Sequence, residues 1–284
     1  MTVDISHLKT WIGRKETLED TVTPVPVRAL STTLDRDDSE VRIGDVLPPL
    51  WHWLYFLPLH RQSEIGPDGH AKRGGFLPPV PLPRRMWAGG RFQFLQPLRV
   101  GDAINRTSEI VNVTMKEGRT GALVFVLVRH HIGNANGVAV VEEHDIVYRD
   151  LPPTAEAPPP PPKAPEGAVW KRTIEPDDVL LFRYSALTFN GHRIHYDRRY
   201  VTGVEGYPGL IVHGPLIATL LTDLIRRNAQ ASMTAFRFKA VSPLFDIAPF
   251  SLCGTPSADG QQVDVWAQGS AGQLAMEAQA TLAV

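Results

Sequence analysis

PLIATLLTDLIRRNA, residues 215 to 229, is the stretch that decides the fold. Its leucines and isoleucines recur at helical spacing, and Pro215 suits a first helical position because the N–H it lacks has no partner there. Further along the chain the period changes to two, since side chains of two kinds alternate over residues 263 to 268 and again over 274 to 282. This order predicts a long helix packed against antiparallel strands, which is an α+β architecture.

The first half of the chain repeats this order. RFQFLQPL at 91 to 98 matches RFKAVSPL at 237 to 244 at Arg, Phe, Pro and Leu, and the helix-like stretch LWHWLYFL precedes it at 50 to 57. Residues 122 to 129 and 138 to 147 have the pattern of strands. We therefore expect each half to form one long helix-like element wrapped by an antiparallel sheet. A short N-terminal helix is also expected, with an apolar stripe formed by Ile5, Leu8, Trp11 and Ile12.

A proline-rich segment divides the chain. Residues 151 to 167, LPPTAEAPPPPPKAPEG, contain eight prolines, which hold the backbone near polyproline II and oppose pairing into a sheet. We predict two domains, 1 to 150 and 168 to 284, joined by this linker. A ligand for a proline-reading module is the alternative, and it fits a tail better than a segment between two halves. Because free sheet edges invite association, we expect the two sheets to join edge to edge, and whole chains could also pair into a homo-oligomer.

Composition disfavours several classes of function. A formal net charge of -1 offers no basic surface for nucleic acid, and no apolar run is long enough to cross a membrane. The single cysteine, Cys253, excludes an intrachain disulfide and a cysteine-rich metal site, and we expect a buried strand thiol there. The first residues have acidic side chains and no apolar signal core. The cytoplasm is therefore the expected compartment.

Two motifs suggest chemistry. FNGHRIH, residues 189 to 195, places the amide of Asn190 five residues before the imidazole of His195, and VHGPL follows at 212 to 216. An imidazole titrates near neutral pH and can act as a base and then as an acid, whereas an amide can only position water through hydrogen bonds. Gly214 begins the central helix, where a backbone N–H can stabilise an anionic oxygen and the missing Cβ permits close approach. Together these residues predict addition of water to, or its removal from, an acyl thioester.

The same motifs carry a resemblance to a known family. FRYSALTFNGHRIHYD at 182 to 197, with GLIVHGPLIATLL at 209 to 221, resembles the MaoC-like, or R-specific, enoyl-thioester hydratases, which have the hot-dog fold. WAGGRFQFLQPLRVGD at 87 to 102 is similar to the diverged N-terminal domain of double hot-dog members. The resemblance is closest to the branch of the mesaconyl-C4-CoA hydratases and the mitochondrial 3-hydroxyacyl-thioester dehydratases. It implies a double hot-dog fold, a coenzyme A thioester substrate, and neither a metal nor another cofactor.

The resemblance also implies roles for single residues. His195 matches the family's catalytic histidine, while Asn190 stands where the general family has an aspartate and the named branch has an amide. His195 must then carry the proton transfer. Each motif residue also has a structural interpretation. Asn190 followed by Gly191 is a common turn signal.

Other polar residues near the motifs have structural explanations too. His192, His195 and His213 could suggest a metal site, but the sequence shows no carboxylate or cysteine cluster to complete one. His213, placed at the substrate-binding turn, is expected to bond a backbone group. Asp197 is expected to fix a loop, and Tyr196 to pack.

The acyl group and the reaction type leave alternatives. A dicarboxylic acyl group, which we favour together with small branched ones, needs a cation in its pocket, and the candidates are Arg183, Arg193 and Arg91. A long chain instead needs an apolar tunnel, with walls from Trp51, Trp53, Tyr55 and Phe56. The carrier, coenzyme A or acyl carrier protein, stays open, as does a dehydratase of fatty-acid metabolism. A thioesterase would need a carboxylate base on the central helix, which has none before Asp223, and His195 argues against a non-catalytic binding subunit.

Overall fold

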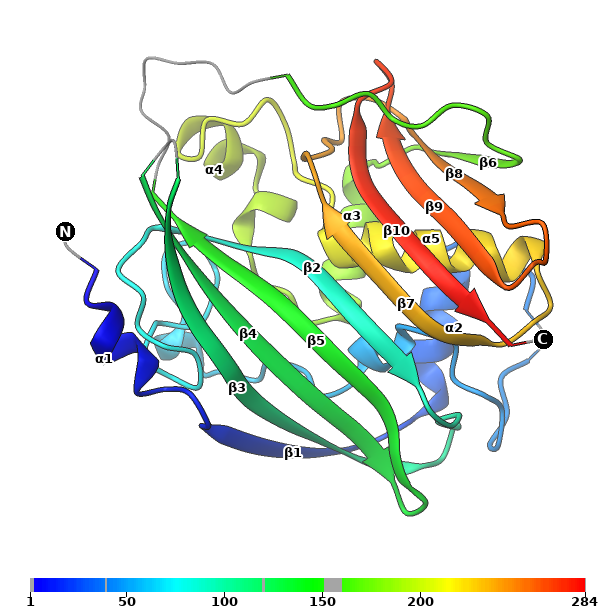
Figure 1. Ribbon diagram of the computed structural model, residues 1–284, viewed down its shortest axis with the longest axis horizontal. Helices are drawn as coiled ribbons and strands as arrows, with labels where there is room; N and C mark the ends of the chain where they lie inside the picture. Colours follow the sequence, from blue (N-terminus) through cyan, green and yellow to red (C-terminus); the bar gives the residue numbers. More distant parts are fainter. Residues whose placement is uncertain (1–2, 39, 119–120, 151–159, 284) are drawn as a thin grey trace.

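The computed structural model describes residues 3–38, 40–118, 121–150 and 160–283 (Figure 1). The strands are β1 Lys15–Thr21, β2 Arg84–Phe94, β3 Ala103–Gly118, β4 Gly121–Asn134, β5 Gly137–Arg149, β6 Trp170–Ile174, β7 Met233–Ala240, β8 Phe250–Pro256, β9 Gln262–Gly269 and β10 Leu274–Leu282. The helices are α1 Ile5–Lys9, α2 Pro24–Thr33, α3 Asp178–Leu187, α4 Arg198–Gly203 and α5 Gly214–Asn228, with 3₁₀ turns η1 Trp51–Leu54, η2 Gln62–Glu64 and η3 Arg193–His195. Within the described residues the strands form one antiparallel sheet, in the order β1-β3-β4-β5-β2-β7-β10-β9-β8-β6, and α5 lies behind β7 and β10 in Figure 1.

The two halves meet edge to edge, as predicted. β2 of the first half pairs antiparallel with β7 of the second, and the register sets Arg91 opposite Arg237 and Phe92 opposite Phe236. The repeated Arg-Phe segments therefore face each other across the junction. Arg91 is neutralised by carboxylates of β5, which reduces the repulsion between the opposed arginines.

Helix α5 is the core of the second half. It runs from Gly214 to Asn228, within one residue of the prediction at each end, and every side chain from 216 to 225 is buried. Burying a single leucine contributes about 1.5–3 kcal/mol, so this helix anchors the sheet around it. Asp223 is fully buried on α5, and its carboxylate is held by three guanidinium groups. These groups belong to Arg36, Arg172 and Arg227.

The prediction of a long helix in the first half is wrong. LWHWLYFL contains only the 3₁₀ turn η1, because the backbone of Leu50 and Phe56 is left-handed, with φ of 68° and 55°. Prolines also flank the stretch at 48, 49 and 58. The proposed tunnel walls Trp51, Tyr55 and Phe56 are instead buried in the main hydrophobic core. Trp53 is only partly buried.

Several smaller predictions have mixed outcomes. α1 buries Leu8, but Ile12 follows the end of the helix and is exposed, so the predicted stripe is too long. Cys253 is buried on β8, as expected. The predicted linker lies outside the described residues up to 159. Beyond that point the segment contains no strand among the described residues, and Lys163 forms one isolated β-bridge with Gln273.

Candidate active site

His195 is buried in the turn η3 and fixed by one backbone contact. Its Nδ1 lies 2.7 Å from the carbonyl oxygen of Ile211. A carbonyl only accepts, so Nδ1 carries the hydrogen and Nε2 keeps a free lone pair. Burial lowers the pKa of His195 to about 4, although the bond to Ile211 opposes this shift. The imidazole is therefore neutral near pH 7 and ready to accept a proton at Nε2.

The ring of His213 packs against the ring of His195. The two rings are stacked with centroids 3.7 Å apart and planes 18° apart. His213 is fully buried, and its Nε2 lies 2.8 Å from the hydroxyl of Ser185, which replaces the backbone partner expected from the sequence. Burial keeps the pKa of His213 well below its ordinary value. His213 therefore supports the site as a neutral, structural side chain.

Ser185 joins the two motifs and was missed by the sequence analysis. Its hydroxyl bonds His213, and its carbonyl oxygen accepts the backbone N–H of Asn190 at 2.8 Å. It lies on α3, one helical turn after the fully buried Leu181. A serine on the buried stripe of a helix needs an internal partner, and that is the signal that could have identified it.

Asn190 closes a turn, so the structural interpretation of this residue is confirmed. Its Oδ1 accepts the backbone N–H of His192 at 3.0 Å, and the preceding Phe189 has a left-handed φ of 49°. This bond fixes which end of the amide is the oxygen. In the described part of the chain the NH₂ group of Asn190 has no partner, so it is the donor available to a ligand.

Gly214 begins α5 directly after His213, which places the helix start beside His195. Its backbone N–H has no hydrogen-bond partner among the described residues. A Cβ at this position would meet nothing within 4 Å, and its φ is not left-handed. No protein contact therefore requires a glycine here, and the open space is available to a thioester.

A loop of the first half packs against the FNGHRIH motif of the second half. The backbone N–H of Arg193 donates to the carbonyl oxygen of Asp68 at 2.9 Å. Gly69, with a φ of 90°, lies so close that a Cβ would approach the carbonyl oxygen of Gly191 to 1.8 Å. Next to this contact the rings of His70 and His192 have centroids 3.9 Å apart. The site is thus built from both halves of the chain.

This loop also supplies a carboxylate beside the histidines, which the sequence analysis did not expect. Asp68, His70 and His192 are the one group with metal-ligand spacing that the described residues contain. His70 Nδ1 is already bonded to Asp68 Oδ2 at 3.0 Å. Neither His195 nor His213 belongs to this group, so the three histidines named from the sequence do not share a site for a metal.

Arg193 and Asp197 fix the catalytic loop. The guanidinium of Arg193 bonds Asp197 at 2.7 and 3.0 Å, donates to the carbonyl oxygen of Pro67 at 2.9 Å, and lies over the ring of Tyr200. Asp197 also caps α4, so its predicted loop-fixing role is confirmed. Tyr196 is exposed and donates to the carbonyl of Gly191 instead of packing. These bonds occupy the guanidinium of Arg193, so it is not available to bind a substrate.

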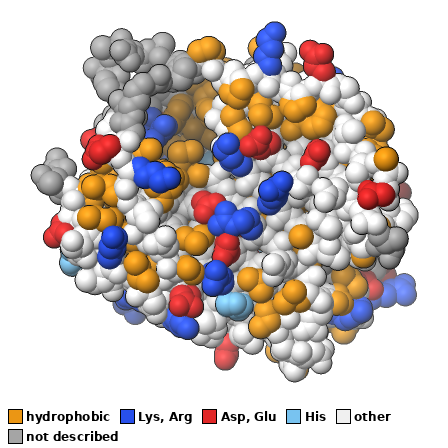
Figure 2. Space-filling model, in the orientation of Figure 1, with side chains coloured by type: hydrophobic (Ala, Val, Ile, Leu, Met, Phe, Trp, Pro, Cys, Tyr) orange, Lys and Arg blue, Asp and Glu red, His pale blue; other side chains and the backbone are white. Residues whose placement is uncertain are grey.

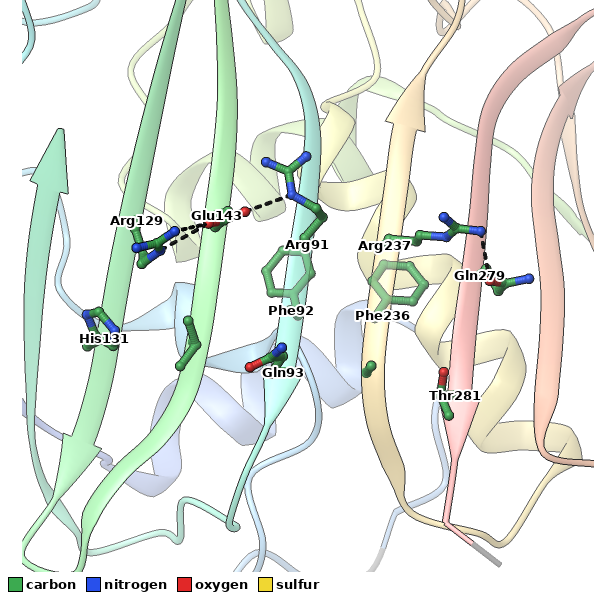
Figure 3. Close-up of a pocket in the computed structure, with 12 residues that line it drawn as sticks. Arg91, Phe92, Gln93, Arg129, His131, Glu143, Phe236, Arg237, Gln279 and Thr281 are labelled. Atoms are coloured by element: carbon green, nitrogen blue, oxygen red, sulfur yellow. Dashed lines mark hydrogen bonds and ion pairs between the residues drawn. The ribbon is translucent and has the colours of Figure 1, made fainter. Parts of the chain in front are cut away.

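Arg91 lies on the opposite face of the sheet from α5. Its neighbour Phe92 is buried in the core, and Arg91 points outward to Glu143 and Asp145. There it lines a shallow hollow across β4, β5, β2, β7 and β10 (Figure 3). Figure 2 shows basic and acidic side chains intermixed over these central strands. The structure therefore does not bring Arg91 to His195, and Arg183 is an exposed residue of α3 outside the histidine cluster.

A sheet of this kind around one buried helix, with a neutral imidazole at the helix start, defines a double hot-dog enzyme. A Mycobacterium tuberculosis protein described as having a double hotdog fold is similar, with a TM-score of 0.57, 13% identity, and coverage of 95% of this chain and 96% of that one. HtdX of the same organism has a TM-score of 0.65 and 19% identity over 94% of this chain and 99% of that one. At these identities the likeness establishes the fold.

Comparison of sequences identifies the family of the chain. The family described as hydroxyacyl-thioester dehydratase type 2 matches residues 50–246. Mesaconyl-C(4)-CoA hydratase of Chloroflexus aurantiacus is 47% identical over 268 residues, which cover 94% of this chain and 95% of that protein. The chain belongs to the hydroxyacyl-thioester dehydratase type 2 family and is a hydratase or dehydratase of the hydro-lyase class. No helix in its described part is long and apolar enough to span a membrane.

Proposed function

We propose that this protein adds water to the double bond of mesaconyl-C4-CoA, or of a similarly small dicarboxylic 2-enoyl-CoA thioester. The observation that carries the chemistry is the tautomer of His195, whose Nδ1–H is held by Ile211 and whose Nε2 is free beside the start of α5. The identity to a mesaconyl-C4-CoA hydratase supports the acyl group.

The reaction follows from three groups. Nε2 of His195 removes a proton from water while the water oxygen bonds the β-carbon, and the electrons of the double bond move onto the thioester oxygen. The N–H of Gly214, at the positive end of α5, stabilises the resulting enolate oxygen. His195 then returns its proton to the α-carbon. Asn190 positions the water, and the reverse sequence is a dehydration.

Two alternatives from the sequence fit the geometry less well. A thioesterase needs a free carboxylate on the central helix, but Asp223 is buried and ion-paired with Arg36, Arg172 and Arg227. A long-chain dehydratase needs an apolar tunnel, and Trp51, Tyr55 and Phe56 are buried in the core.

The test compares substrates. Mesaconyl-C4-CoA, its C1 isomer, crotonyl-CoA and a long-chain 2-enoyl-CoA are incubated with the protein, and enoyl absorbance and free thiol are followed together. We expect loss of enoyl absorbance without thiol release, fastest with mesaconyl-C4-CoA. Release of thiol would indicate a thioesterase, a preference for the long chain would indicate a fatty-acid dehydratase, and no change with any thioester would indicate a binding subunit.

The pH profile reports on His195. Because a protonated imidazole cannot accept a proton, we expect kcat/KM to stay level from pH 8 to about 5 and to fall with an apparent pKa near 4, well below the ordinary 6.5. The unfolded chain binds this proton below about pH 6.5, whereas the folded chain binds it only near pH 4. The free energy of unfolding therefore decreases as the pH falls from about 6.5 to about 4. Circular dichroism at each pH separates the two effects. An activity limb near 6.5 in folded protein would contradict the assignment.

Asn190 is predicted to position water through its free NH₂ group and the remaining lone pair of Oδ1. Asn190→Ala loses these bonds and the turn bond to His192, and we expect turnover to fall about tenfold or more. Asn190→Asp keeps the turn bond and an acceptor, so it should retain substantial activity, with the pKa of His195 raised by the new charge. The turnover of both variants, measured from pH 4.5 to 8, decides between a water-positioning residue and a turn residue. An alanine variant as active as the wild type would leave Asn190 as a turn residue only.

The division into domains 1 to 150 and 168 to 284, the cytoplasmic location and the pairing of whole chains stay predictions. Light scattering of the purified protein would test the oligomeric state, and fractionation of cells would test the compartment.

A further inference from the structure

The proposed substrate places a negative charge close to the reacting carbon. In mesaconyl-C4-CoA the free carboxylate is attached to the carbon β to the thioester, which is also the carbon that receives water. A binding group for this carboxylate must therefore lie close to His195. The identity of this cation, which rests on the proposed function, is open because Arg91 is bound to Asp145 and Arg193 to the carbonyl oxygen of Pro67.

Arg85 has the required position on the sheet. It lies on β2 and is the cross-strand partner of Tyr148 on β5, whose side chain is buried on the inner face. Two residues further along β2, Trp87 is on the same face and stacks on His144 with centroids 3.8 Å apart. A register shift between Trp87 and Gly89 then turns Arg91 to the outer face. Arg85 therefore shares the face of the sheet on which the catalytic helix lies.

Arg85 is exposed, and its side chain bonds that of Tyr148, but it lacks a carboxylate partner among the residues that the structure describes. Its neighbour Arg84 differs, because Arg84 is bound by the carbonyl and the carboxylate of Glu205. A guanidinium has five N–H donors, so the bond to Tyr148 leaves donors that can hold a carboxylate of a ligand.

Arg85 also lies beside the histidine cluster. Burial is the main cause that lowers the pKa of both His70 and His192, and the positive charge of Arg85 adds to the shift in each. The ring of His192 is in turn 5.5 Å from that of His195, edge to face. Asp68 is the neighbouring anion, and both its oxygens are engaged by His70. Arg85 is thus a cation without a carboxylate partner that lies near His70 of the loop from 65 to 71 and near His192.

We propose that Arg85 binds the free carboxylate of the acyl group and thereby selects dicarboxylic 2-enoyl thioesters. The first half of the chain then supplies specificity from β2 and the covering loop, and the second half supplies the chemistry. A guanidinium can hold a carboxylate with two parallel hydrogen bonds, which also fixes the β-carbon in front of the water.

The test uses Arg85→Gln, with Arg91→Gln as the matched control on the outer face of the same strand. Succinyl-CoA and butyryl-CoA are unreactive probes that differ in having a carboxylate or a methyl group at the same carbon. Calorimetry should show Arg85→Gln weakening succinyl-CoA binding by about 10- to 100-fold, while butyryl-CoA binding changes less than about twofold. Turnover should follow, with kcat/KM reduced for mesaconyl-C4-CoA and unchanged for crotonyl-CoA. Arg85→Lys should recover part of the loss.

Two outcomes would overturn this assignment. Equal weakening of both probes, absent with N-acetylcysteamine thioesters, would place Arg85 on a coenzyme A phosphate. Unchanged binding of succinyl-CoA by folded Arg85→Gln protein would remove Arg85 from the site altogether. The proposed function fails separately, when the wild type itself shows no preference for a substrate with a carboxylate.

Discussion

Replacing His195 with alanine should lower turnover at least about a hundredfold, the usual effect of removing a general acid or base. His213, the imidazole stacked on His195, cannot replace it, because His213 is fully buried with Nε2 bonded to Ser185. The fold should survive, since the substitution removes one hydrogen bond from a short turn and leaves α5 and the sheet junction unchanged. Steady-state kinetics with mesaconyl-C4-CoA, and circular dichroism of the same samples, measure the two quantities.

Two comparisons make this result specific. His131→Ala removes an imidazole from the hollow on the outer face of the sheet and should leave turnover unchanged. Added imidazole should restore part of the activity of His195→Ala, because it can enter the space and carry the proton. A folded His195→Ala protein with wild-type turnover would exclude the mechanism.

Local patterns in the sequence predicted most of the second half. Helix α5 has an uninterrupted apolar stripe, and the alternation over β9 and β10 is regular, so neighbouring residues alone determine these elements. The junction of the sheets was predicted from the tendency of free sheet edges to pair, but the sequence did not indicate that the repeated Arg-Phe segments, in β2 and β7, would form it. The hydrophobic stretch from 50 to 57 was wrongly predicted as a helix, because flanking prolines and the left-handed backbone of Leu50 and Phe56 prevent the helix that its composition favours.

The proposed catalytic residues were predictable where they share one motif, but the residues that contact them were not. Asp68 and His70 reach His192 only because the two halves pack together, and no pattern in either half indicates that contact. Arg91 could have been excluded earlier. It precedes Phe92 in a strand, and strand side chains alternate, so an inward Phe92 requires an outward Arg91. The same rule applied to Arg85 would have required knowing the register shift at 87 to 89.

Replacing Gly214 with valine should damage turnover far more than stability. Valine keeps the backbone N–H, but its branched side chain would fill the space left for the thioester and hold the thioester oxygen away from this donor. An oxyanion donor that is not used costs about a hundred- to a thousandfold in kcat. The folded protein itself has room, because a Cβ at 214 meets nothing within 4 Å. The following Pro215 disfavours a helical backbone before it once a Cβ is present, so we expect only a modest loss of thermal stability.

The control for this substitution is Gly203→Val at the end of α4, where a Cβ also meets nothing within 4 Å and the φ is not left-handed. That variant should resemble Gly214→Val in melting temperature and the wild type in turnover. Gly214→Ala should fall between the two, because one methyl group narrows the cleft without closing it. If Gly214→Val keeps the kinetics of the wild type, the N–H at the start of α5 does not bind the thioester oxygen. The enolate would then need another donor, and the open space before α5 would have no part in the reaction.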